Sequence, residues 1–311
     1  MQGYDIIGDI HGHHRTLKAL LGQLGYVVSD GVWRHSSRKV VFLGDFIDRG
    51  PGQQETLAIV RPMVDQGAAL AVMGNHEFNA IAWATIDPAS GDYLRPHSEK
   101  NRGQHEVFLD TFEDTPAYAD AIDWFRNLPL WLDLGDFRVI HACWEQGLID
   151  RIRGEQDGSD QLGDDLLIAA GQRGTWQYDA VETLLKGKEI PLPEGGAFHD
   201  KDGNERHNIR VRWWDGAAGT YRDAFMGPES ARTHIPDDPI DGDHLVEYAH
   251  DFPPVFIGHY WLEGELVPLA PNIACLDYSV AKPGGSLVAY SWDGETQILG
   301  EKFTSVARIE P

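Results

Sequence analysis

The stretch YDIIGDIHG, residues 4–12, sets the pattern that decides the fold. An apolar run ends in glycine, a polar turn follows, and leucines at helical spacing begin at Leu17. The same arrangement returns in KVVFLGDFIDRG, residues 39–50, and in ALAVMGNHE, residues 69–77. Short continuous apolar runs bounded by turns are typical of strands that are buried on both faces, as in parallel sheets. We therefore expect successive βαβ units and an α/β fold.

The rest of the chain adds strands and one long interruption. A loop containing Gly, Pro and His is expected from about Asp87 to Arg102. We interpret the polar interval at about 148–252 as an insertion or cap within a single domain, 1–311, and its Asp202-Gly203 pair predicts a hairpin turn. Further strands are predicted at Leu130–Leu134 and Phe137–Ala142, and from Val255, Ile273 and Ser286.

Composition limits the possible partners and the setting. The 311 residues are 42% hydrophobic and 24% charged, which is ordinary for a globular protein. A formal net charge of −23 disfavours binding to nucleic acid and to an anionic membrane surface. No apolar run is long enough to span a bilayer. Two cysteines, Cys143 and Cys275, and an amino terminus without a signal-peptide pattern predict a reducing, cytoplasmic setting.

The polar residues that end the strands form the candidate site. In open α/β sheets, ligands bind at the carboxyl ends of the strands, so GDIHG, GDFIDRG, GNHE and the later HACW and GHYW should converge. Oxygen and imidazole donors in this number suit two divalent ions about 3.5–4 Å apart that share a carboxylate. The expected metal ligands are Asp9, His11, Asp45, Asn75, His141 and His259.

Two ions in one site indicate phosphoryl chemistry. Together they hold the substrate oxygens and lower the pKa of a bridging water, so that a metal-bridging hydroxide becomes the nucleophile. His76, adjacent to Asn75, is expected to act as the general acid for the leaving group, and Asp48 to orient its imidazole. Arg49 offers a planar guanidinium for the phosphate oxygens.

At these residues the sequence resembles the calcineurin-like metallophosphoesterase superfamily. The motifs GDxHG, GDxxDRG and GNHE and two later histidines occur in the order of its phosphoprotein-phosphatase branch. The resemblance implies a sandwich of two mixed β-sheets flanked by helices. It also implies that Asp9, His11 and Asp45 hold one metal, and that Asp45, Asn75, His141 and His259 hold the other. Manganese is expected first, with iron, zinc, cobalt or nickel as alternatives.

The resemblance also implies further contacts to phosphate. Asn75 is expected to touch phosphate as well as metal. A second phosphate-binding arginine is usual in this branch, and the segment IRVRWW offers Arg210 or Arg212. Where the family often has LDTG, this chain has LDYS, so Tyr278 replaces a small residue.

Three functions stay open on the sequence. The leading one is a phosphomonoesterase of bacterial serine/threonine protein phosphatase type, which acts on a phosphorylated protein or small phosphoester. The second is a symmetrical bis(5'-nucleosyl)-tetraphosphatase. Those relatives usually lack the aspartate of the DRG triplet and have NHD, whereas this chain has Asp48 and Glu77. The third is a catalytically silent binding scaffold. The pattern leaves the oligomeric state open. Histidines outside the motifs, His105 among them, are expected to be structural or solvated.

Overall fold

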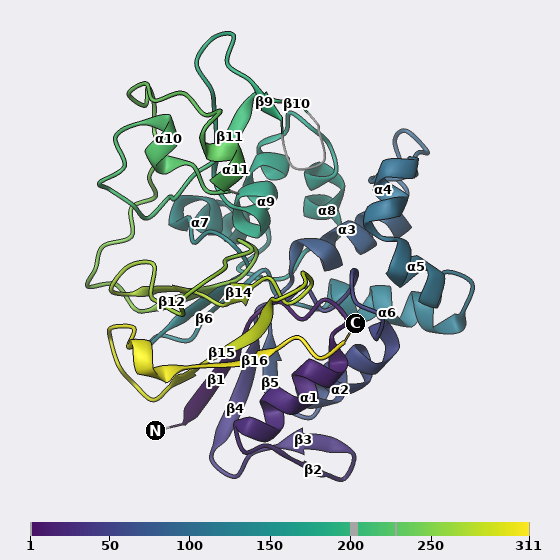
Figure 1. Cartoon of the computed structure of the whole chain (residues 1–311). Coiled ribbons are helices and arrows are strands. Elements are labelled where there is room, and N and C mark those ends of the chain that lie inside the picture. Colours follow the sequence, from purple (N-terminus) through teal and green to yellow (C-terminus); the bar gives the residue numbers. More distant parts are fainter. Residues whose placement is uncertain (1, 200–204, 228, 311) are drawn as a thin grey trace.

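Two β-sheets packed face to face and flanked by helices form the body of the molecule (Figure 1). The structure is a computed structural model that describes residues 2–199, 205–227 and 229–310. The expected sandwich of two mixed sheets is confirmed. No helix in the described part of the chain is long and apolar enough to cross a membrane.

The first sheet contains the three strands predicted from the opening motifs. β1 runs parallel to β4, and β4 runs parallel to β5, while β15 pairs antiparallel with β1. β14 and β16 both pair antiparallel with β15. Its strands are β1 (Gly3–Ile7), β4 (Arg38–Phe42), β5 (Ala69–Ala71), β14 (Asp277–Tyr278), β15 (Ser286–Trp292) and β16 (Phe303–Ala307).

The second sheet brings the two later histidines to the site. β12 lies between two parallel neighbours, β7 and β13, and β6 pairs antiparallel with β7. All four strands lie in or next to predicted runs. They are β6 (Trp131–Asp133), β7 (Arg138–Ile140), β12 (Val255–Ile257) and β13 (Ile273–Cys275).

Alternation along the strands builds two cores. Ile6 packs between the sheets with Val41 and Phe256, whereas the next residue, Ile7, packs in the core outside the first sheet with Phe42. Because both faces of these strands are covered, their sequences are continuously apolar.

Helices cover the outer faces of the sheets. α1 and α2 pack beside the first sheet, and α3 begins directly at the end of β5 (Figure 1). The helices before the insertion are α1 (His14–Gln23), α2 (Gln53–Asp65), α3 (Asn75–Ala84), α4 (Glu99–Gln104), α5 (Glu106–Phe112) and α6 (Pro116–Arg126).

The segment between β7 and β12 holds helices and short strands above the sheets (Figure 1). Ile190, Ile209 and Phe225 centre a small core of its own. Trp213 is fully buried, and its Nε1 donates to the Tyr260 hydroxyl at 3.1 Å. The elements are α7 (Gln146–Glu155), α8 (Asp164–Ala170), α9 (Trp176–Lys186), β8 (Glu189–Pro191), β9 (Phe198–His199), β10 (Glu205–Arg206), β11 (Asn208–Arg210), α10 (Tyr221–Ala224) and α11 (Glu229–Arg232).

Some elements differ from the sequence expectation. The predicted loop ends in α4, because the Ser98 side chain accepts a hydrogen bond from Asn101 N at 3.2 Å and caps a short helix. The hairpin of β2 (Val27–Ser29) and β3 (Val32–Arg34), the strand β16 and the short helix η1 (Gly300–Lys302) were not predicted. β9 and β10 pair antiparallel as a hairpin requires, but its Asp202-Gly203 turn lies outside the described residues.

Candidate metal centre

The predicted ligands come together where the strands of both sheets end. His11 follows β1, Asp45 follows β4, and Asn75 starts α3 directly after β5. His141 follows β7 and His259 follows β12. All of these side chains and that of Asp9 are buried. Residues up to 250 positions apart in the chain therefore meet in one site.

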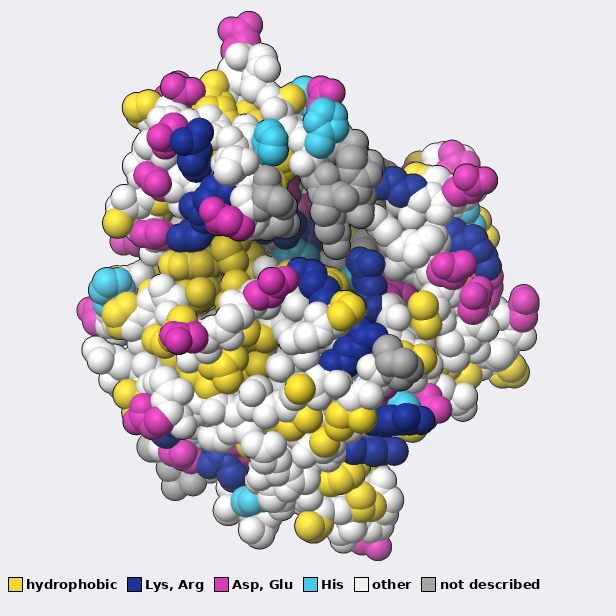
Figure 2. Space-filling model, in the orientation of Figure 1, with side chains coloured by type: hydrophobic (Ala, Val, Ile, Leu, Met, Phe, Trp, Pro, Cys, Tyr) yellow, Lys and Arg dark blue, Asp and Glu magenta, His cyan; other side chains and the backbone are white. Residues whose placement is uncertain are grey.

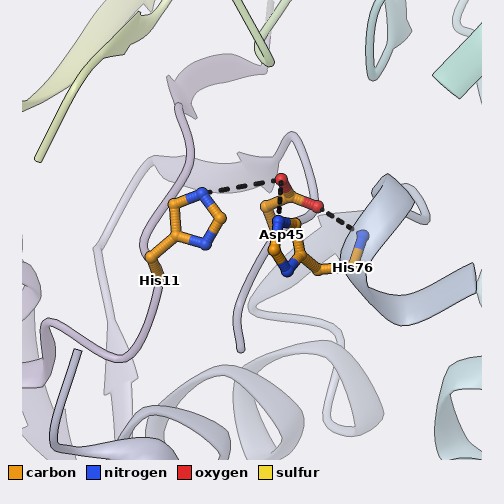
Figure 3. A group of neighbouring side chains, drawn as sticks. All are labelled: His11, Asp45 and His76. Atoms are coloured by element: carbon orange, nitrogen blue, oxygen red, sulfur yellow. Dashed lines mark hydrogen bonds and ion pairs between the residues drawn. The ribbon is translucent and has the colours of Figure 1, made fainter. Parts of the chain in front are cut away.

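Asp45 lies at the centre of this group. Its Oδ2 is 3.6 Å from His11 Nε2 and 3.4 Å from His141 Nε2. Figure 3 shows the rings of His11 and His76 directed at this carboxylate. Two sets of donors suited to metals share Asp45: one contains His11 and His76, and the other contains His141 and His259. One carboxylate therefore links two candidate ion positions.

Hydrogen bonds from Nδ1 to backbone carbonyls hold the imidazole rings of His11 and His141 so that Nε2 faces the site. His11 Nδ1 donates to Ile47 O at 2.9 Å, and His141 Nδ1 donates to Leu43 O at 2.6 Å. Second-shell bonds of this kind set the tautomer of metal-binding histidines. The Nε2 atoms of His11 and His259 are buried and have no hydrogen-bond partner among the described residues. Nitrogen atoms left bare in this way fit coordination to a metal.

Asp9 lies at the edge of the cluster. Its Oδ2 accepts a hydrogen bond from His259 N at 3.1 Å, and it belongs to neither of the two tight donor sets. Burial and the carboxylate of Asp277 raise the pKa of Asp9 well above its usual range. A nearby cation would offset both effects, so the donor chemistry at Asp9 also fits a metal.

The histidines and carboxylates of the site act strongly on one another. Burial alone would raise the pKa of Asp45, but His141 and His76 lower it well below its usual range. Burial would lower the pKa of His141, yet Asp45 raises it to about 10. Burial and His76 lower the pKa of His11 to about 3. The carboxylate of Asp45 is thus held in its ionised form, as a bridging ligand requires.

His76 faces both Asp45 and Asp48. Its Nε2 is 4.0 Å from Asp45 Oδ2, and its Nδ1 donates to Asp48 Oδ2. Burial would raise the pKa of Asp48, but hydrogen bonds from His105 and His76 lower it to about 2. Burial would likewise lower the pKa of His76, which Asp45 and Asp48 raise. His76 is therefore held through one ring nitrogen while the other faces the cluster.

The arginines differ in their surroundings. Arg49 is exposed, and its guanidinium lies 5.6 Å from the centre of the Trp261 ring. Arg210 is partly buried, and its Nε has no hydrogen-bond partner in the part of the chain that the structure describes. After burial, Arg210 is the largest influence that lowers the pKa of His259. The charged groups that act most strongly on the pKa of Arg212 are Arg232 and Asp215, which lie with it in the segment between β7 and β12. Of the two candidates in the insertion, only Arg210 lies toward the metal ligands.

The backbone at the site is unusual. A positive φ is uncommon in residues other than glycine, and this backbone conformation costs such a residue about 1–3 kcal/mol. Five residues of the site nevertheless have positive φ angles, which run from 46° to 71°. The site residues with positive φ are His11, Asp45, Asp48, Arg49 and His259.

Three residues that sequence reasoning did not place in the site support it. The Glu77 carboxylate accepts hydrogen bonds from Asp45 N and Phe46 N, both at 2.8 Å. Asp277 accepts from Trp261 N at 2.7 Å, and His105 donates to Asp48. The sequence carried a signal for the position of Glu77, because an acidic residue three positions after Gly74 is typical of the first turn of a helix. Asp277 is the aspartate of the LDYS segment, although only its neighbour Tyr278 was noted there, and His105 had no motif to mark it.

The surface around the site is hollowed. Figure 2 shows Lys and Arg side chains gathered around a hollow between the segment that joins β7 to β12 and the two sheets, with His side chains inside it. A separate cavity of about 770 Å³, lined by Arg126, Ile152 and Leu166, contains none of the predicted site residues.

Comparison with known proteins gives the same family as the motifs. The profile of the calcineurin-like phosphoesterase family matches residues 4–259. An asymmetrical bis(5'-nucleosyl)-tetraphosphatase, PrpE, of Geobacillus thermodenitrificans is 48% identical over 159 residues, which is 48% of this chain and 60% of that protein. A symmetrical bis(5'-nucleosyl)-tetraphosphatase of Vibrio cholerae is 34% identical over 138 residues, 44% of this chain and 43% of that protein. The chain spans about half the length of the curated relatives it matches.

A solved structure matches the fold over the whole chain. The protein serine/threonine phosphatase from Saccharomyces cerevisiae aligns with a TM-score of 0.51 at 13% identity, and covers 100% of this chain and 81% of that one. At this identity the match concerns the fold alone.

Proposed function

This chain belongs to the calcineurin-like phosphoesterase family, and from that membership we propose that it is a two-metal hydrolase of dinucleoside polyphosphates. As a metallophosphoesterase it is a hydrolase that acts on phosphoesters. The observation that supports two-metal hydrolysis is the pair of donor sets sharing Asp45, with the His76–Asp48 pair beside them. A site with all of its ligands and a placed acid argues for an enzyme rather than a silent scaffold.

The metal ligands are proposed as follows. Asp9, His11 and Asp45 hold one ion, and Asp45, Asn75, His141 and His259 hold the other. When bound, such ions activate a water molecule for attack on phosphorus and neutralise the phosphoryl oxygens. Nitrogen and oxygen donors together suit manganese, iron, zinc, cobalt or nickel, and we propose manganese first.

His76 is proposed as the general acid. Its Nδ1 is committed to Asp48, so Nε2 is the atom that carries the proton to the leaving oxygen. That nitrogen faces the cluster, 4.0 Å from the shared carboxylate of Asp45. His76 also belongs to one of the two donor sets, so its loss has to be read on metal content as well as on turnover.

Arg49, Asn75 and Arg210 are proposed to hold phosphate. Arg49 supports this role by its exposed guanidinium beside Trp261. Arg210 supports it by a buried Nε without a partner and by its effect on His259. Arg212 is the weaker candidate, because its charged neighbours lie within the insertion. The insertion that carries Arg210 would cover the site as a cap.

The relatives favour a dinucleoside tetraphosphate as substrate. The two tetraphosphatases described above match 44% and 48% of this chain, at 34% and 48% identity. The phosphoprotein phosphatase reading is kept as the second candidate, because Asp48 and Glu77 keep that branch's DRG and NHE motifs.

The test compares the two substrates on one preparation. Protein stripped with chelator and reloaded with Mn²⁺ is assayed for kcat/KM on diadenosine tetraphosphate and on a phosphoserine peptide. We expect a preference for the dinucleotide of at least about tenfold, which is about 1.4 kcal/mol of differential transition-state binding. The products separate the two relatives, since two ADP indicate symmetrical cleavage and ATP with AMP indicates asymmetrical cleavage.

The control variant is Asp45→Asn, which should remove metal binding and hydrolysis together. A tenfold preference for the phosphoserine peptide would overturn the proposed dinucleoside tetraphosphate substrate and support the phosphoprotein phosphatase instead. Bound metal with no hydrolysis of either substrate would favour the silent scaffold.

A further inference from the structure

The carboxylate of Asp48 is shared between two histidines. His76 Nδ1 donates to Oδ2, and His105 Nδ1 lies 2.8 Å from Oδ1 and 3.0 Å from Oδ2. Asp48 and His105 are 1% and 2% exposed. Three side chains from separate parts of the chain thus form one buried line of hydrogen bonds that ends at the candidate acid.

His105 is itself rigidly held. It ends α4 and starts α5, and its ring stacks on Phe108 with centroids 4.8 Å apart. The Nε2 atom of His105 is buried, and no described residue offers it a hydrogen bond. Only Nδ1 therefore makes a polar contact, and that contact is with Asp48.

The chain before His105 is fastened to α3, the helix that carries His76. The His97 ring is stacked between Trp83 and Tyr93, with centroids 3.8 Å away on each side. Arg95 donates to Asn79 Oδ1 on α3 at 2.9 Å. The segment before His105 is therefore anchored on α3, the helix that carries His76. His105 and His76 both contact the carboxylate of Asp48.

Asp48 needs such support. It has φ of 68°, and a buried carboxylate is costly unless its oxygens accept hydrogen bonds. With only one donor, the carboxylate could turn about its χ angles and release His76. With His105 on Oδ1, the other oxygen stays directed at His76 Nδ1.

We propose that His105 is a positioning residue that fixes the Asp48 carboxylate and, through it, the ring orientation of His76. The inference rests on the proposed acid role of His76. His105 belongs to neither of the two donor sets and contacts Asp48 instead, so its loss should slow only the step that needs the acid. That step matters most when the leaving group is a poor one.

The experiment uses the metal-loaded enzyme and two aryl phosphates, phenyl phosphate with a poor leaving group and para-nitrophenyl phosphate with a good one. His105→Phe keeps a flat ring against Phe108 but has no donor. It should lower kcat on phenyl phosphate about 10–100-fold, and kcat on para-nitrophenyl phosphate less than about threefold, with KM and metal content unchanged.

His105→Asn is the matched rescue variant. Its amide places an N–H close to the position of Nδ1, whereas the longer amide of His105→Gln does not. On phenyl phosphate the Asn variant should therefore exceed both the Phe and the Gln variants by about tenfold. If His105→Phe does not fold, the comparison of Asn with Gln decides alone, and equal rates would overturn the inference.

A loss that is equal on the two substrates would also overturn it, because a merely structural role lowers both. His76→Asn is measured alongside. If His76→Asn shows the leaving-group dependence and His105→Phe does not, only this inference fails. If the loss in His76→Asn does not depend on the leaving group, the proposed acid role of His76 is wrong, and the inference about His105 is wrong as well.

Discussion

Gly258 leaves its side-chain position to the carboxylate of Asp9. An ideal Cβ on Gly258 would lie 2.1 Å from Asp9 Oδ1, closer than any real contact. The glycine of the GHYW motif is therefore required by the packing of a proposed metal ligand. It also precedes His259, a proposed ligand of the other ion.

Gly258→Ala should accordingly displace Asp9 and weaken metal binding by about 10–100-fold. The measurement is metal bound per protein after dialysis against a series of Mn²⁺ concentrations. Gly22→Ala is the control, because a Cβ there would have no neighbour within 4 Å. Equal metal content in the two variants would contradict this role of Asp9.

His76→Asn should lower kcat by about 10²–10⁴-fold, with the smallest loss on substrates that have good leaving groups. The reason is that the variant lacks the proton donor while the other ligands remain. Turnover on phenyl phosphate and metal content are measured on the same sample. Loss of metal together with activity would assign His76 as a ligand, and unchanged turnover would remove it from the mechanism.

Glu310→Gln should lower the free energy of unfolding at pH 7 by about 1 kcal/mol. The Glu310 carboxylate accepts hydrogen bonds from Arg15 N and from Thr16 Oγ1, the latter at 2.6 Å, at the start of α1. Burial would raise the pKa of Glu310, but these donors lower it below its ordinary value of 4.5.

The sign of the pH dependence follows from that direction. A depressed pKa stabilises the fold above the unfolded value, so the contribution is complete at neutral pH and is lost as pH falls below about 4.5. Urea unfolding of both proteins from pH 7 to pH 3 should show the difference shrinking with acid. Glu247→Gln, at an exposed position, is the control and should show no such trend.

Salt should raise kcat/KM for anionic substrates. The net charge of −23 repels them at a distance, while the Lys and Arg side chains around the hollow, and the metal ions that the site would hold, attract them locally. Screening weakens the long-range repulsion more than the short contacts. The rate is measured on diadenosine tetraphosphate from low to physiological ionic strength, with metal content checked at each point. A falling rate would be the contrary result.

The part of the fold that the sequence predicted is the part with a local signal. β1, β4 and β5 lie in the apolar runs before each motif, because burial on both faces demands apolar residues throughout. The β2–β3 hairpin was missed because β2 is exposed along its whole length and shows no alternation. β16 is only half buried and gave an equally weak pattern.

The residues of the site likewise fall into those that a local sequence signal predicted and those that it did not. Asp45 and His76 follow strand ends, and topology alone brings strand ends together. His105 lies 57 residues from Asp48, and their contact depends on how α3, α4 and α5 pack. No spacing rule describes that packing, so a histidine expected to be structural or solvated proved to contact the acid's partner. Tyr278, noted as a departure from the family, donates to Glu265 O at 3.1 Å and holds a loop.

The hydrogen bonds of Trp213 have a consequence for protein engineering. Trp213 donates to the Tyr260 hydroxyl, which donates to Ala142 O at 3.0 Å, so the insertion is joined to the residues that directly follow His259 and His141. Exchanging the segment for that of a homologue would disturb both metal-binding histidines unless the tryptophan is transplanted with its partners. Libraries meant to change substrate preference should therefore vary the residues around Arg210 and keep this tryptophan–tyrosine pair constant.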